Sequence, residues 1–448
     1  MKVEICAIGG YSEVGKNMTA IKVGNEVIIC DMGFYLPEII AYEEEGEVVR
    51  RDLTKEKLLN INAIPDDRVI KEWQPYVKAI VLGHCHLDHI GAVPYMAKDY
   101  KCPIIGTPYT LEVLKTILRD ERINIPNKFK PLNVNARIKI SDKISIEFIN
   151  ATHSTLQVVM IAIHTPAGTI VYANDYKFDK HPILGKKPNY ARLKELGRSG
   201  NVIAVIMDAL YSDAHMKTPS EKVAREMLNE VMLGTENRGH AVIVTTFASH
   251  IARLKSIIDF GLRMRRKIVM LGRSMHKYVS AAEKLNLVRF TKDVELIGRS
   301  KAAKRKLEAI SKARDKYLIV CTGNQGEPNA MLTRITRNEM PFKFKPGDQV
   351  IFSSRIIPDP ANMANRAMVE ERLSRMGVRI FKDIHVSGHA SREDHRDLIT
   401  MLKPKHVIPA HGDVDKLTPL AKLATEMGYV LGKDVHIMRD GQLIELES

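Results

Sequence analysis

The sequence of 448 residues has few of the features that mark secreted or membrane proteins. It contains five cysteines, an odd number, and no two of them have Cys-x-x-Cys spacing. A disulfide framework is therefore not expected, and the pattern is typical of a reducing compartment. The N-terminal residues lack the basic and then apolar layout of a signal peptide. No apolar run approaches the roughly 20 residues that cross a bilayer, so we expect a cytoplasmic protein that does not act at a membrane.

Acidic residues are too few to balance the basic ones. The chain has 68 Lys and Arg residues against 53 Asp and Glu residues, a formal net charge of +15. A thermophile-type surface rich in Lys and Glu is an alternative explanation, but it requires no excess of one sign. The excess therefore favours a polyanionic partner such as nucleic acid. Two basic clusters, at residues 263–267 and 301–306, are either solvated faces or contacts for an RNA backbone.

The most informative stretch is residues 84–89, His-Cys-His-Leu-Asp-His, in which three imidazoles and a carboxylate fall close together. Imidazole and carboxylate are the usual ligands of Zn²⁺ and related divalent metals. His84 and His86 are two residues apart, so in an extended segment both point to the same side. Asp88 and His89 follow where the pattern turns helical, so they should point elsewhere. The stretch therefore predicts a loop that serves two neighbouring ions, rather than a polar loop with incidental histidines.

Ligand-type residues also stand at the ends of predicted strands. The apolar segments 144–154, 168–179 and 406–413 carry His153, Asp175 and His411 at or near their ends. An isolated His153 would more often be a satisfied polar residue, but together with the histidine motif we expect it to bind metal. Asp31 ends an earlier apolar run and is a candidate to orient metal-binding histidines, with an ordinary turn residue as the alternative.

Residues 201–360 alternate apolar strands with helices, which is the βαβ signature of a parallel sheet. Functional residues of such sheets gather at the C-terminal strand ends. Each small polar strand end alone is more often a loop or a helix cap, but together they predict one polar rim. The substrate-binding candidates on this rim are Ser249, His250, Arg273, Ser274, Ser353 and Ser354. Asp208 lies at the end of the first of these strands.

Two other loops have the composition of phosphate sites. In the loop 385–390, backbone N–H groups and a serine hydroxyl suit a phosphate, so the substrate-binding candidates there are His385, Val386, Ser387, Gly388 and His389. Residues 10–17 nearly match the nucleotide-binding pattern GxxxxGK[ST]. However, Asn17 replaces the hydroxyl residue and a strand pattern follows, so a nucleotide site is disfavoured.

Two further segments carry structural expectations. Residues 36–75 show no regular periodicity, and we expect a long surface insertion that could flank the mouth of a site. The last segment, residues 436–446, is expected to form a closing β-hairpin.

Taken together, these motifs resemble the metallo-β-lactamase superfamily and, more specifically, the ribonuclease J family. The family resemblance is carried by the segments 10–17, 245–250, 272–275, 322–328, 385–390 and 409–412, which span nearly the whole chain. The interval between Asp175 and His411 is too long for a plain hydrolase of this superfamily and resembles an inserted β-CASP domain. The resemblance implies an α/β fold, with a metallo-β-lactamase αββα sandwich formed by residues 1–205 and 361–448. Residues 206–360 would form the β-CASP domain with its parallel sheet.

The resemblance also implies a centre with two Zn²⁺ ions. The implied ligands of one ion are His84, His86 and His153, those of the other are Asp88, His89 and His411, and Asp175 would bridge the two. The implied catalytic residues are His389, Asp88 and Asp208, with His389 as proton donor or transition-state stabiliser near the leaving group.

The sequence departs from the family pattern in two places. Asp208 is followed by Ala209-Leu210, where family members often have Ser-Thr. The chain ends at Ser448 without the extra C-terminal domain of bacterial members, which resembles the shorter archaeal forms.

The function implied is a zinc-dependent 5′-to-3′ exonuclease on single-stranded RNA with a preference for a 5′-monophosphate end, acting in RNA processing and decay. The alternative within the same fold is an endoribonuclease with little 5′-end dependence. The inserted domain and the basic charge disfavour a small-molecule hydrolase, and the complete ligand set disfavours an RNA-binding scaffold with an inactive site. The cleft between the domains is expected to admit a single strand. A homodimer and protein partners in RNA decay or on the ribosome are further expectations that the sequence does not decide.

Overall fold

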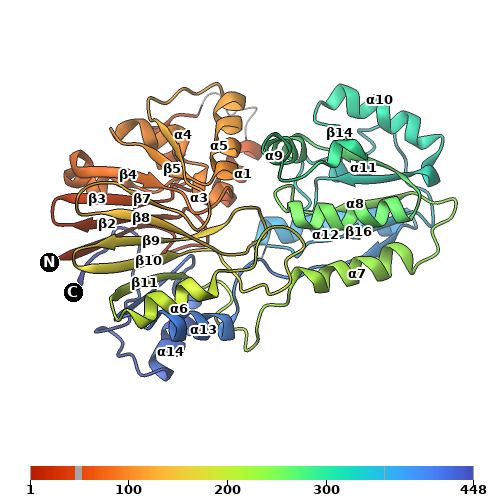
Figure 1. Ribbon diagram of the computed structural model, residues 1–448. Coiled ribbons are helices and arrows are strands. Elements are labelled where there is room, and N and C mark those ends of the chain that lie inside the picture. The colour runs from red at the N-terminus through yellow and green to blue at the C-terminus, as the bar shows by residue number, and fades with distance from the viewer. Residues whose placement is uncertain (1, 46–52, 358, 447–448) are drawn as a thin grey trace. The chain divides into compact units, whose positions relative to one another are not determined.

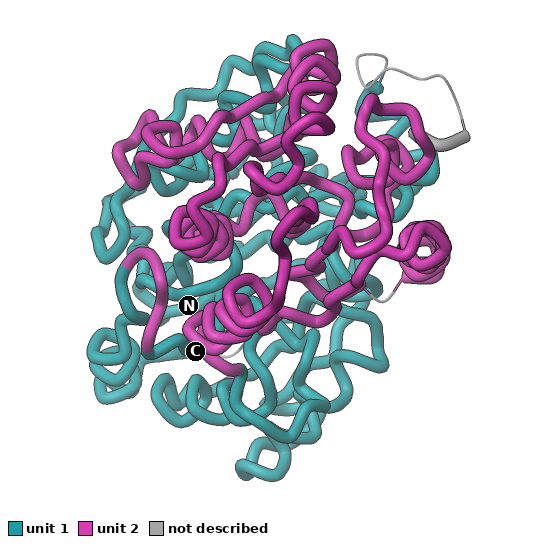
Figure 2. Tube along the Cα trace, turned by 90° about the vertical axis from the view of Figure 1, so that its right-hand side faces the viewer, with its two compact units in different colours: residues 1–180, 186–218, 388–448 teal, residues 181–185, 219–387 magenta. Residues whose placement is uncertain are grey.

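The computed structural model describes residues 2–45, 53–357 and 359–446 of the chain. They form two compact units, coloured separately in Figure 2. Unit 1 comprises residues 1–180, 186–218 and 388–448, and unit 2 comprises residues 181–185 and 219–387. Unit 1 is a sandwich of two sheets and unit 2 contains a parallel sheet, so the predicted fold class is confirmed.

Unit 1 contains two β-sheets. The first has the strand order β19-β1-β2-β3-β4-β5-β6, and the second has the order β18-β11-β10-β9-β8-β7. The strands of the first sheet are β1 (Val3–Gly9), β2 (Met18–Val23), β3 (Glu26–Cys30), β4 (Val77–Val81), β5 (Ile104–Gly106), β6 (Phe129–Pro131) and β19 (Leu443–Leu446). The strands of the second sheet are β7 (Arg137–Lys139), β8 (Ser145–Asn150), β9 (Val159–Thr165), β10 (Gly168–Ala173), β11 (Val202–Asp208) and β18 (His406–Ala410).

The main core of unit 1 lies between these sheets. Alternate apolar residues of each strand face inward, so Ile5 and Val81 of the first sheet share a buried cluster with Phe148 and Ile206 of the second. The outer face of the second sheet is covered by α6 (Tyr190–Arg198), α13 (Arg392–Leu402) and α14 (Val414–Glu426). The first sheet is flanked by the short helices α3 (Leu87–Ile90) and α4 (Val93–Met96), by the 3₁₀ turn η3 (Ala97–Asp99) and by α5 (Pro108–Glu121), as Figure 1 shows.

Residues 36–75 are not irregular, and this prediction was wrong. They contain α1 (Leu36–Glu45), α2 (Lys55–Asn60) and the 3₁₀ helix η2 (Asp67–Tyr76). The buried carboxylate of Asp67 accepts hydrogen bonds from Lys55 Nζ and Tyr100 Oη, both at 2.8 Å. These elements are only six to ten residues long, so each gives a weak periodic signal, although η2 buries Ile70 and Trp73 three residues apart. Residues 46–52 lie outside the described residues.

The predicted C-terminal hairpin is also absent from the described residues. Within residues 436–446 the structure has one strand, β19, and this strand pairs antiparallel with β1 at the other end of the chain. A local pattern of alternating residues does not reveal its partner when that partner is more than 400 positions away, so the sequence suggested a neighbour instead.

Unit 2 is built on a parallel sheet with the strand order β14-β13-β15-β12-β16-β17. Its strands are β12 (Val242–Thr245), β13 (Lys267–Leu271), β14 (Val294–Ile297), β15 (Tyr317–Cys321), β16 (Gln349–Phe352) and β17 (Arg379–Phe381). Its helices are α7 (Glu221–Leu233), α8 (Ile251–Arg263), α9 (Arg273–Lys284), α10 (Ser300–Ser311), α11 (Met331–Thr336) and α12 (Pro360–Arg375). Short 3₁₀ turns, η4 (Phe290–Lys292) and η5 (Arg314–Lys316), precede β14 and β15. The strand pairings of this sheet are parallel in the described residues, as the alternation of strands and helices predicted.

The units join at residues 218/219 and 387/388, whereas the sequence placed the domain junctions at 205/206 and 360/361. The first difference arises because β11 pairs with β10 and β18 and so completes the second sheet of unit 1. The second arises because α12 packs Val369 and Leu373 into the core of unit 2. An apolar strand preceding a helix looks the same in sequence whichever sheet it joins.

A buried ion pair links the helices of unit 2 to its sheet. Arg253 on α8 is fully buried, and its guanidinium donates to Glu221 Oε1 at 2.5 Å and to Glu221 Oε2 at 2.9 Å. The same guanidinium also donates to the carbonyl oxygens of Ser353 at 2.9 Å and Ile384 at 3.1 Å. Arg253 therefore connects α7, α8 and the loops after β16 and β17.

Replacement of Arg253 by methionine should destabilise unit 2 by about 3–5 kcal/mol, because it leaves the Glu221 carboxylate buried without its partner. Denaturant unfolding followed by far-UV circular dichroism measures this loss in the free energy of unfolding. Arg263→Met on the same helix is the control, because Arg263 is exposed and its loss should cost no more than about 0.5 kcal/mol. Equal midpoints for the two variants would contradict this assignment.

None of the helices that the structure describes combines the length and the apolar character needed to span a membrane.

Candidate metal centre

The strands of the second sheet deliver four candidate site residues to one edge. Strands β10, β11 and β18 are parallel, and β8 runs in the same direction because β9 is antiparallel to both β8 and β10. Their C-terminal ends therefore lie along the same edge of the sheet. The residues at or just beyond these ends are His153, Asp175, Asp208 and His411. The first sheet contributes Asp31 after β3 and the histidine motif after its parallel neighbour β4.

Three of these residues have left-handed backbone conformations. The φ angles are 61° at Asp31, 57° at Asp175 and 63° at His411. Such angles are uncommon for residues other than glycine, and they turn the chain sharply out of each strand. Hydrogen bonds fix two of the turns, from Asp31 N to Val81 O at 3.0 Å and from His411 N to Gly10 O at 2.6 Å. Backbone strain of this kind is concentrated at functional sites.

The first group of candidate ligands contains His84, His86, His153 and Asp175. His86 Nδ1 lies 3.0 Å from His84 Nε2 and 3.1 Å from His153 Nε2. His153 donates its Nδ1 proton to the carbonyl oxygen of Gly388 at 2.6 Å, so its Nε2 lone pair is directed into the group. Burial lowers the pKa of His86 to about 4 and the pKa values of His84 and His153 well below the usual range. All three imidazoles are therefore neutral at pH 7, as metal ligands must be.

The second group contains Asp88, His89 and His411. His89 Nε2 lies 3.5 Å from Asp88 Oδ2 and 3.2 Å from Asp175 Oδ2. Burial opposes protonation of His89, yet the carboxylates of Asp175, Asp88 and Asp31 raise its pKa well above the ordinary value. The three carboxylates around His89 thus give this buried site a negative electrostatic potential that attracts positive charge.

Asp175 belongs to the first group and also lies close to both histidines of the second group. Its Oδ2 lies 3.5 Å from both His84 Nε2 and His153 Nε2, and its Oδ1 lies 3.7 Å from His411 Nδ1. Burial opposes ionisation, but the surrounding imidazoles, above all His411 and His89, hold the pKa of Asp175 well below its usual range. The side chain is buried and ionised, and Oδ1 accepts no hydrogen bond from the described residues.

These observations fit divalent cations. Tetrahedral zinc with Zn–N distances of 2.0–2.1 Å separates its ligand atoms by about 3.3 Å. The nitrogen and oxygen atoms of the first group approach one another at 3.0–3.5 Å. The unpartnered Asp175 Oδ1 is a further sign, because buried carboxylate oxygens are otherwise paired. The residues present therefore suit two cations that share Asp175.

Asp31 supports the second group from behind. Its Oδ2 accepts from His89 Nδ1 at 2.7 Å and from the Tyr172 hydroxyl at 3.0 Å, and its Oδ1 accepts from Gly83 N at 2.9 Å. The bond to Nδ1 fixes the tautomer of His89 and turns Nε2 toward Asp88 and Asp175. The structure therefore places Asp31 where the sequence suggested, behind a histidine and away from the candidate ligand atoms.

His389 stands beside both groups and is oriented by Asp208. His389 Nδ1 donates to Asp208 Oδ2 at 2.8 Å, while Asp208 Oδ1 accepts from Leu210 N at 2.8 Å. Burial lowers the pKa of His389, but the carboxylates of Asp208 and Asp175 raise it to about 9. His389 also forms a third possible ligand group with Asp175 and His411. The imidazole is 18% exposed, whereas Asp208 is fully buried, so His389 is the member of the pair that solvent or substrate can reach.

The loop 385–389 crosses the junction between the units. His385, Val386 and Ser387 belong to unit 2, and Gly388 and His389 belong to unit 1. A Cβ atom at Gly388 would lie 2.8 Å from His153 Nδ1, so a glycine is needed for the carbonyl to reach that imidazole.

The predicted polar rim of unit 2 is mostly buried. Ser249, His250, Ser353 and Ser354 are at most 9% exposed. Ser353 Oγ accepts from Arg253 and donates to the carbonyl oxygen of Ile384, and His250 Nε2 lies 3.4 Å from Glu221. Arg273 and Ser274, by contrast, are exposed in the first turn of α9. Ser353 and His250 therefore hold parts of unit 2 together, whereas the buried Ser354 Oγ has no hydrogen-bond partner among the described residues. The exposed pair stays a candidate for contact with a ligand.

The near-match to a nucleotide-binding loop has a structural role. Lys16 is 4% exposed, and its Nζ lies 2.9 Å from Asn62 Oδ1, 3.0 Å from Glu13 Oε2 and 3.2 Å from Asp440 Oδ2. The ammonium group is thus enclosed by carboxylates of unit 1, which disfavours a phosphate in the same place.

The sequence reasoning missed Asn17, Tyr172 and Asn174 as residues of the site. All three are buried and form hydrogen bonds next to the candidate ligands. The glycine-rich pattern of residues 10–17 drew attention to Asn17, although it suggested nucleotide binding rather than a role beside metal ligands.

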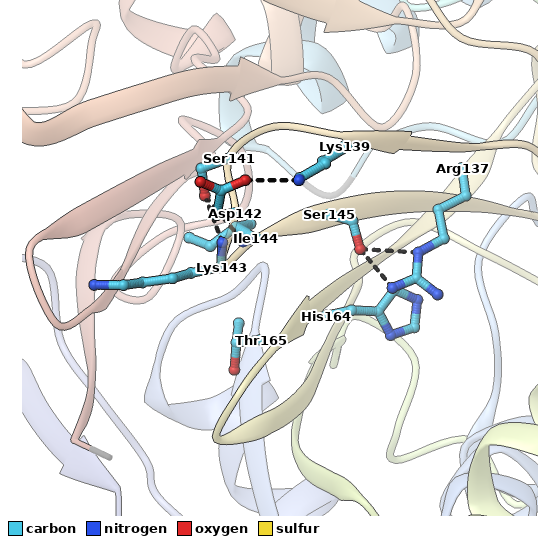
Figure 3. A pocket seen from close by; sticks show the side chains of 9 residues that line it. All are labelled: Arg137, Lys139, Ser141, Asp142, Lys143, Ile144, Ser145, His164 and Thr165. Atoms are coloured by element: carbon cyan, nitrogen blue, oxygen red, sulfur yellow. Dashed lines mark hydrogen bonds and ion pairs between the residues drawn. The ribbon is translucent and has the colours of Figure 1, made fainter.

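A separate open cavity of about 560 Å³ lies on unit 1 around the β7–β8 turn and the end of β9 (Figure 3). It is lined by Arg137, Lys139, Ser141, Asp142, Lys143, Ile144, Ser145, His164 and Thr165. Arg137 donates to Ser145 Oγ at 2.8 Å, and Lys139 pairs with Asp142 at 2.7 Å. The cavity includes none of the predicted site residues, and the basic side chains on the edge strand β7 are typical of protection against edge-to-edge pairing.

Three family models match successive parts of the chain. Residues 60–217 match the beta-lactamase superfamily domain, residues 239–371 the beta-CASP domain of ribonuclease J, and residues 375–438 the Zn-dependent metallo-hydrolase RNA specificity domain. The chain is also 46% identical to ribonuclease J of Methanocaldococcus jannaschii, over 100% of this chain and 99% of the relative. The chain belongs to the ribonuclease J family. It is therefore a metal-dependent ribonuclease of the β-CASP class, and its RNA specificity domain implies RNA binding.

Other relatives are consistent with this membership. Ribonuclease J of Pyrococcus abyssi is 43% identical over 99% of this chain and 97% of the relative. Ribonuclease J 1 of Streptococcus pyogenes is 31% identical over 100% of this chain but 75% of the relative. A crystal structure of a protein of unknown function from Enterococcus faecalis V583 superposes with a TM-score of 0.67 at 17% identity, over 100% of both chains, and this likeness shows the fold alone.

Proposed function

We propose that this ribonuclease J family member is a two-zinc 5′-to-3′ exonuclease that acts on single-stranded RNA and prefers a 5′-monophosphate end. The observation that carries the proposal is the convergence of His84, His86 and His153 on one side of Asp175 and of Asp88, His89 and His411 on the other. Zinc is the metal that this set of five imidazoles and two carboxylates favours. Bound cations would supply Lewis-acid activation of water and neutralise charge on the scissile phosphate.

The residues of the chain supply the proton for the leaving group. His389 donates its Nδ1 proton to Asp208, so the second proton of the imidazolium is carried on Nε2. Because the carboxylates keep its pKa above 7, His389 is protonated at neutral pH and can donate from Nε2 to the departing 3′-oxygen. Asp208 keeps the ring oriented throughout this transfer and favours its charged form.

The 5′-end preference rests on the loop 385–389. Backbone N–H groups and the hydroxyl of Ser387 can donate hydrogen bonds to a terminal phosphate. The next two residues of the loop are Gly388, whose carbonyl oxygen accepts from His153, and His389. A 5′-phosphate held there would place the following phosphodiester near the candidate cations. The net charge of +15 favours attraction of the RNA strand as a whole.

Digestion of single-stranded RNA carrying a 5′-monophosphate, hydroxyl or triphosphate tests this proposal. We expect mononucleotides released from the 5′ end, with the monophosphate preferred about 10- to 100-fold over the hydroxyl, because a hydrogen bond to a charged group contributes about 1.5–3 kcal/mol. Ser387→Ala should reduce this preference, whereas Ser311→Ala on α10 should not change it. Equal internal fragments from all three RNAs would instead indicate an endoribonuclease with little 5′-end dependence.

A further inference from the structure

Asn17 lies inside a network of buried hydrogen bonds next to the candidate metal centre. Its Oδ1 accepts from Asn174 Nδ2 at 2.8 Å, and the same Nδ2 donates to the Tyr172 hydroxyl at 3.1 Å. Tyr172 donates to Asp31, which accepts from His89 Nδ1. Asn17 Nδ2 donates to the carbonyl oxygen of Asp88 at 3.1 Å and lies 3.1 Å from His89 Nε2, the atom assigned to the cation.

The same amide oxygen is bonded to the other imidazole of the second ligand group. His411 Nδ1 lies 3.1 Å from Asn17 Oδ1 in hydrogen-bonding geometry. An amide oxygen accepts and cannot donate, so His411 must carry its proton on Nδ1 in this arrangement. Its lone pair is then on Nε2, which is the atom left to bind a cation. Asn17 therefore fixes the tautomer of His411, as Asp31 fixes that of His89.

The chain around Asn17 is shaped to admit this side chain. Gly10 has φ 85°, and a Cβ atom there would lie 2.5 Å from Asn17 Oδ1. The main chain of Asn17 is held by bonds from its N to Asp88 O and from Gly33 N to its O, both at 3.0 Å. A Cβ atom at Gly33 would collide with Asp88 O at 1.6 Å, so this glycine lets the two loops meet. The enclosed Lys16 anchors the neighbouring position to Glu13 and Asp440.

We propose that Asn17 is a positioning residue for the second cation, the one assigned to Asp88, His89 and His411. An amide suits this position because it accepts from His411 and Asn174 while it donates to Asp88 O, which neither a serine hydroxyl nor a carboxylate can do with the same geometry. The inference rests on the proposed two-zinc function, and it explains why residues 10–17 resemble a phosphate loop but end in asparagine.

The test is the zinc content and zinc affinity of the full-length chain. Zinc-free protein is equilibrated against buffered free Zn²⁺, and bound zinc is measured by elemental analysis across a titration. We expect two ions in the wild-type chain and about one in Asn17→Ala at the same free Zn²⁺, with the affinity for the second ion lowered about 10- to 100-fold. The ion held by His84, His86 and His153 should bind with unchanged affinity.

Two further variants keep the test decisive. Asn174→Ala removes the donor that orients the Asn17 amide and should weaken the same ion, so the inference can be tested even where Asn17→Ala does not fold. Asn150→Ala is the matched control, because Asn150 is a buried asparagine of the same unit that donates to the carbonyl oxygens of Lys186 and Lys187. We expect Asn150→Ala to retain both ions.

The outcomes separate this inference from the proposed function. Two ions of unchanged affinity in both Asn17→Ala and Asn174→Ala would overturn the role of Asn17 while leaving the two-zinc function intact. Loss of both ions together in Asn17→Ala would also overturn it, because the assignment is to one ion. A wild-type chain that binds no zinc would remove the proposed function itself, and with it the basis of this inference.

Discussion

Replacement of His84 by alanine should abolish RNA hydrolysis, with a loss on the order of 10⁴-fold in single-turnover rate. His84 is fully buried, and its Nε2 lies 3.0 Å from His86 Nδ1 and 3.5 Å from Asp175 Oδ2. Alanine removes one candidate ligand and leaves an opening in the first group. RNA binding should remain within a few-fold of wild type, because surface Lys and Arg residues supply most of the attraction to phosphates.

His164→Ala is the control for this prediction. His164 belongs to the same unit, and its Nε2 bonds to Glu147 Oε2 at 2.8 Å, outside both candidate ligand groups. This variant should retain turnover, and filter binding of a short RNA should give similar affinities for both variants and wild type. Full hydrolytic activity in His84→Ala, with metal still bound, would show that the first group is not needed for catalysis.

Replacement of His389 by alanine should lower the rate by about 10²- to 10⁴-fold without loss of metal. The imidazole is held by Asp208 at 2.8 Å and stands beside both candidate ligand groups, so its loss would remove the proposed proton donor for the 3′-oxygen. Zinc content measured alongside single-turnover rates separates this role from ligation. A His389→Ala chain that has lost a zinc ion would instead place His389 in the third ligand group, with Asp175 and His411.

The pH profile gives a second check on His389. A group with a raised pKa is protonated below that pKa and loses its proton as the pH rises through it. The wild-type rate should therefore fall on the alkaline side, at or below pH 9, because the pKa of His389 is about 9 and bound cations would repel its charge. In His389→Ala this alkaline decrease should disappear. An unchanged decrease would mean that another group controls the profile.

The candidate ligands could be predicted from the sequence because their signals are local. The motif at residues 84–89 is dense in ligand-type side chains, and His153, Asp175 and His411 follow apolar strands whose ends meet at one edge. Parallel strands impose this convergence whatever the loops between them, so a correct strand pattern was enough. The assignment of these residues as ligands stays a prediction that the metal measurements test.

The features that the sequence did not reveal depend on contacts between distant segments. Strand β19 pairs with β1, although its sequence suggested a hairpin with the residues just before it. Strand β11 pairs with β18 in the second sheet of unit 1, although its sequence resembles the strands of unit 2. Ser353 was predicted to bind substrate because it follows a strand end, but it is buried and bonded to Arg253 and Ile384. Asn17 lies more than 390 positions from His411, so no local pattern could show that its amide fixes that imidazole.

Crystals of the full chain equilibrated with Zn²⁺, with data collected across the zinc absorption edge, test the paired-cation centre most directly. Two anomalous peaks about 3.5–4 Å apart are expected. One should lie among His84, His86 and His153, the other among Asp88, His89 and His411, and Asp175 should contact both. A single peak, or none within reach of Asp175, would contradict the two-cation account.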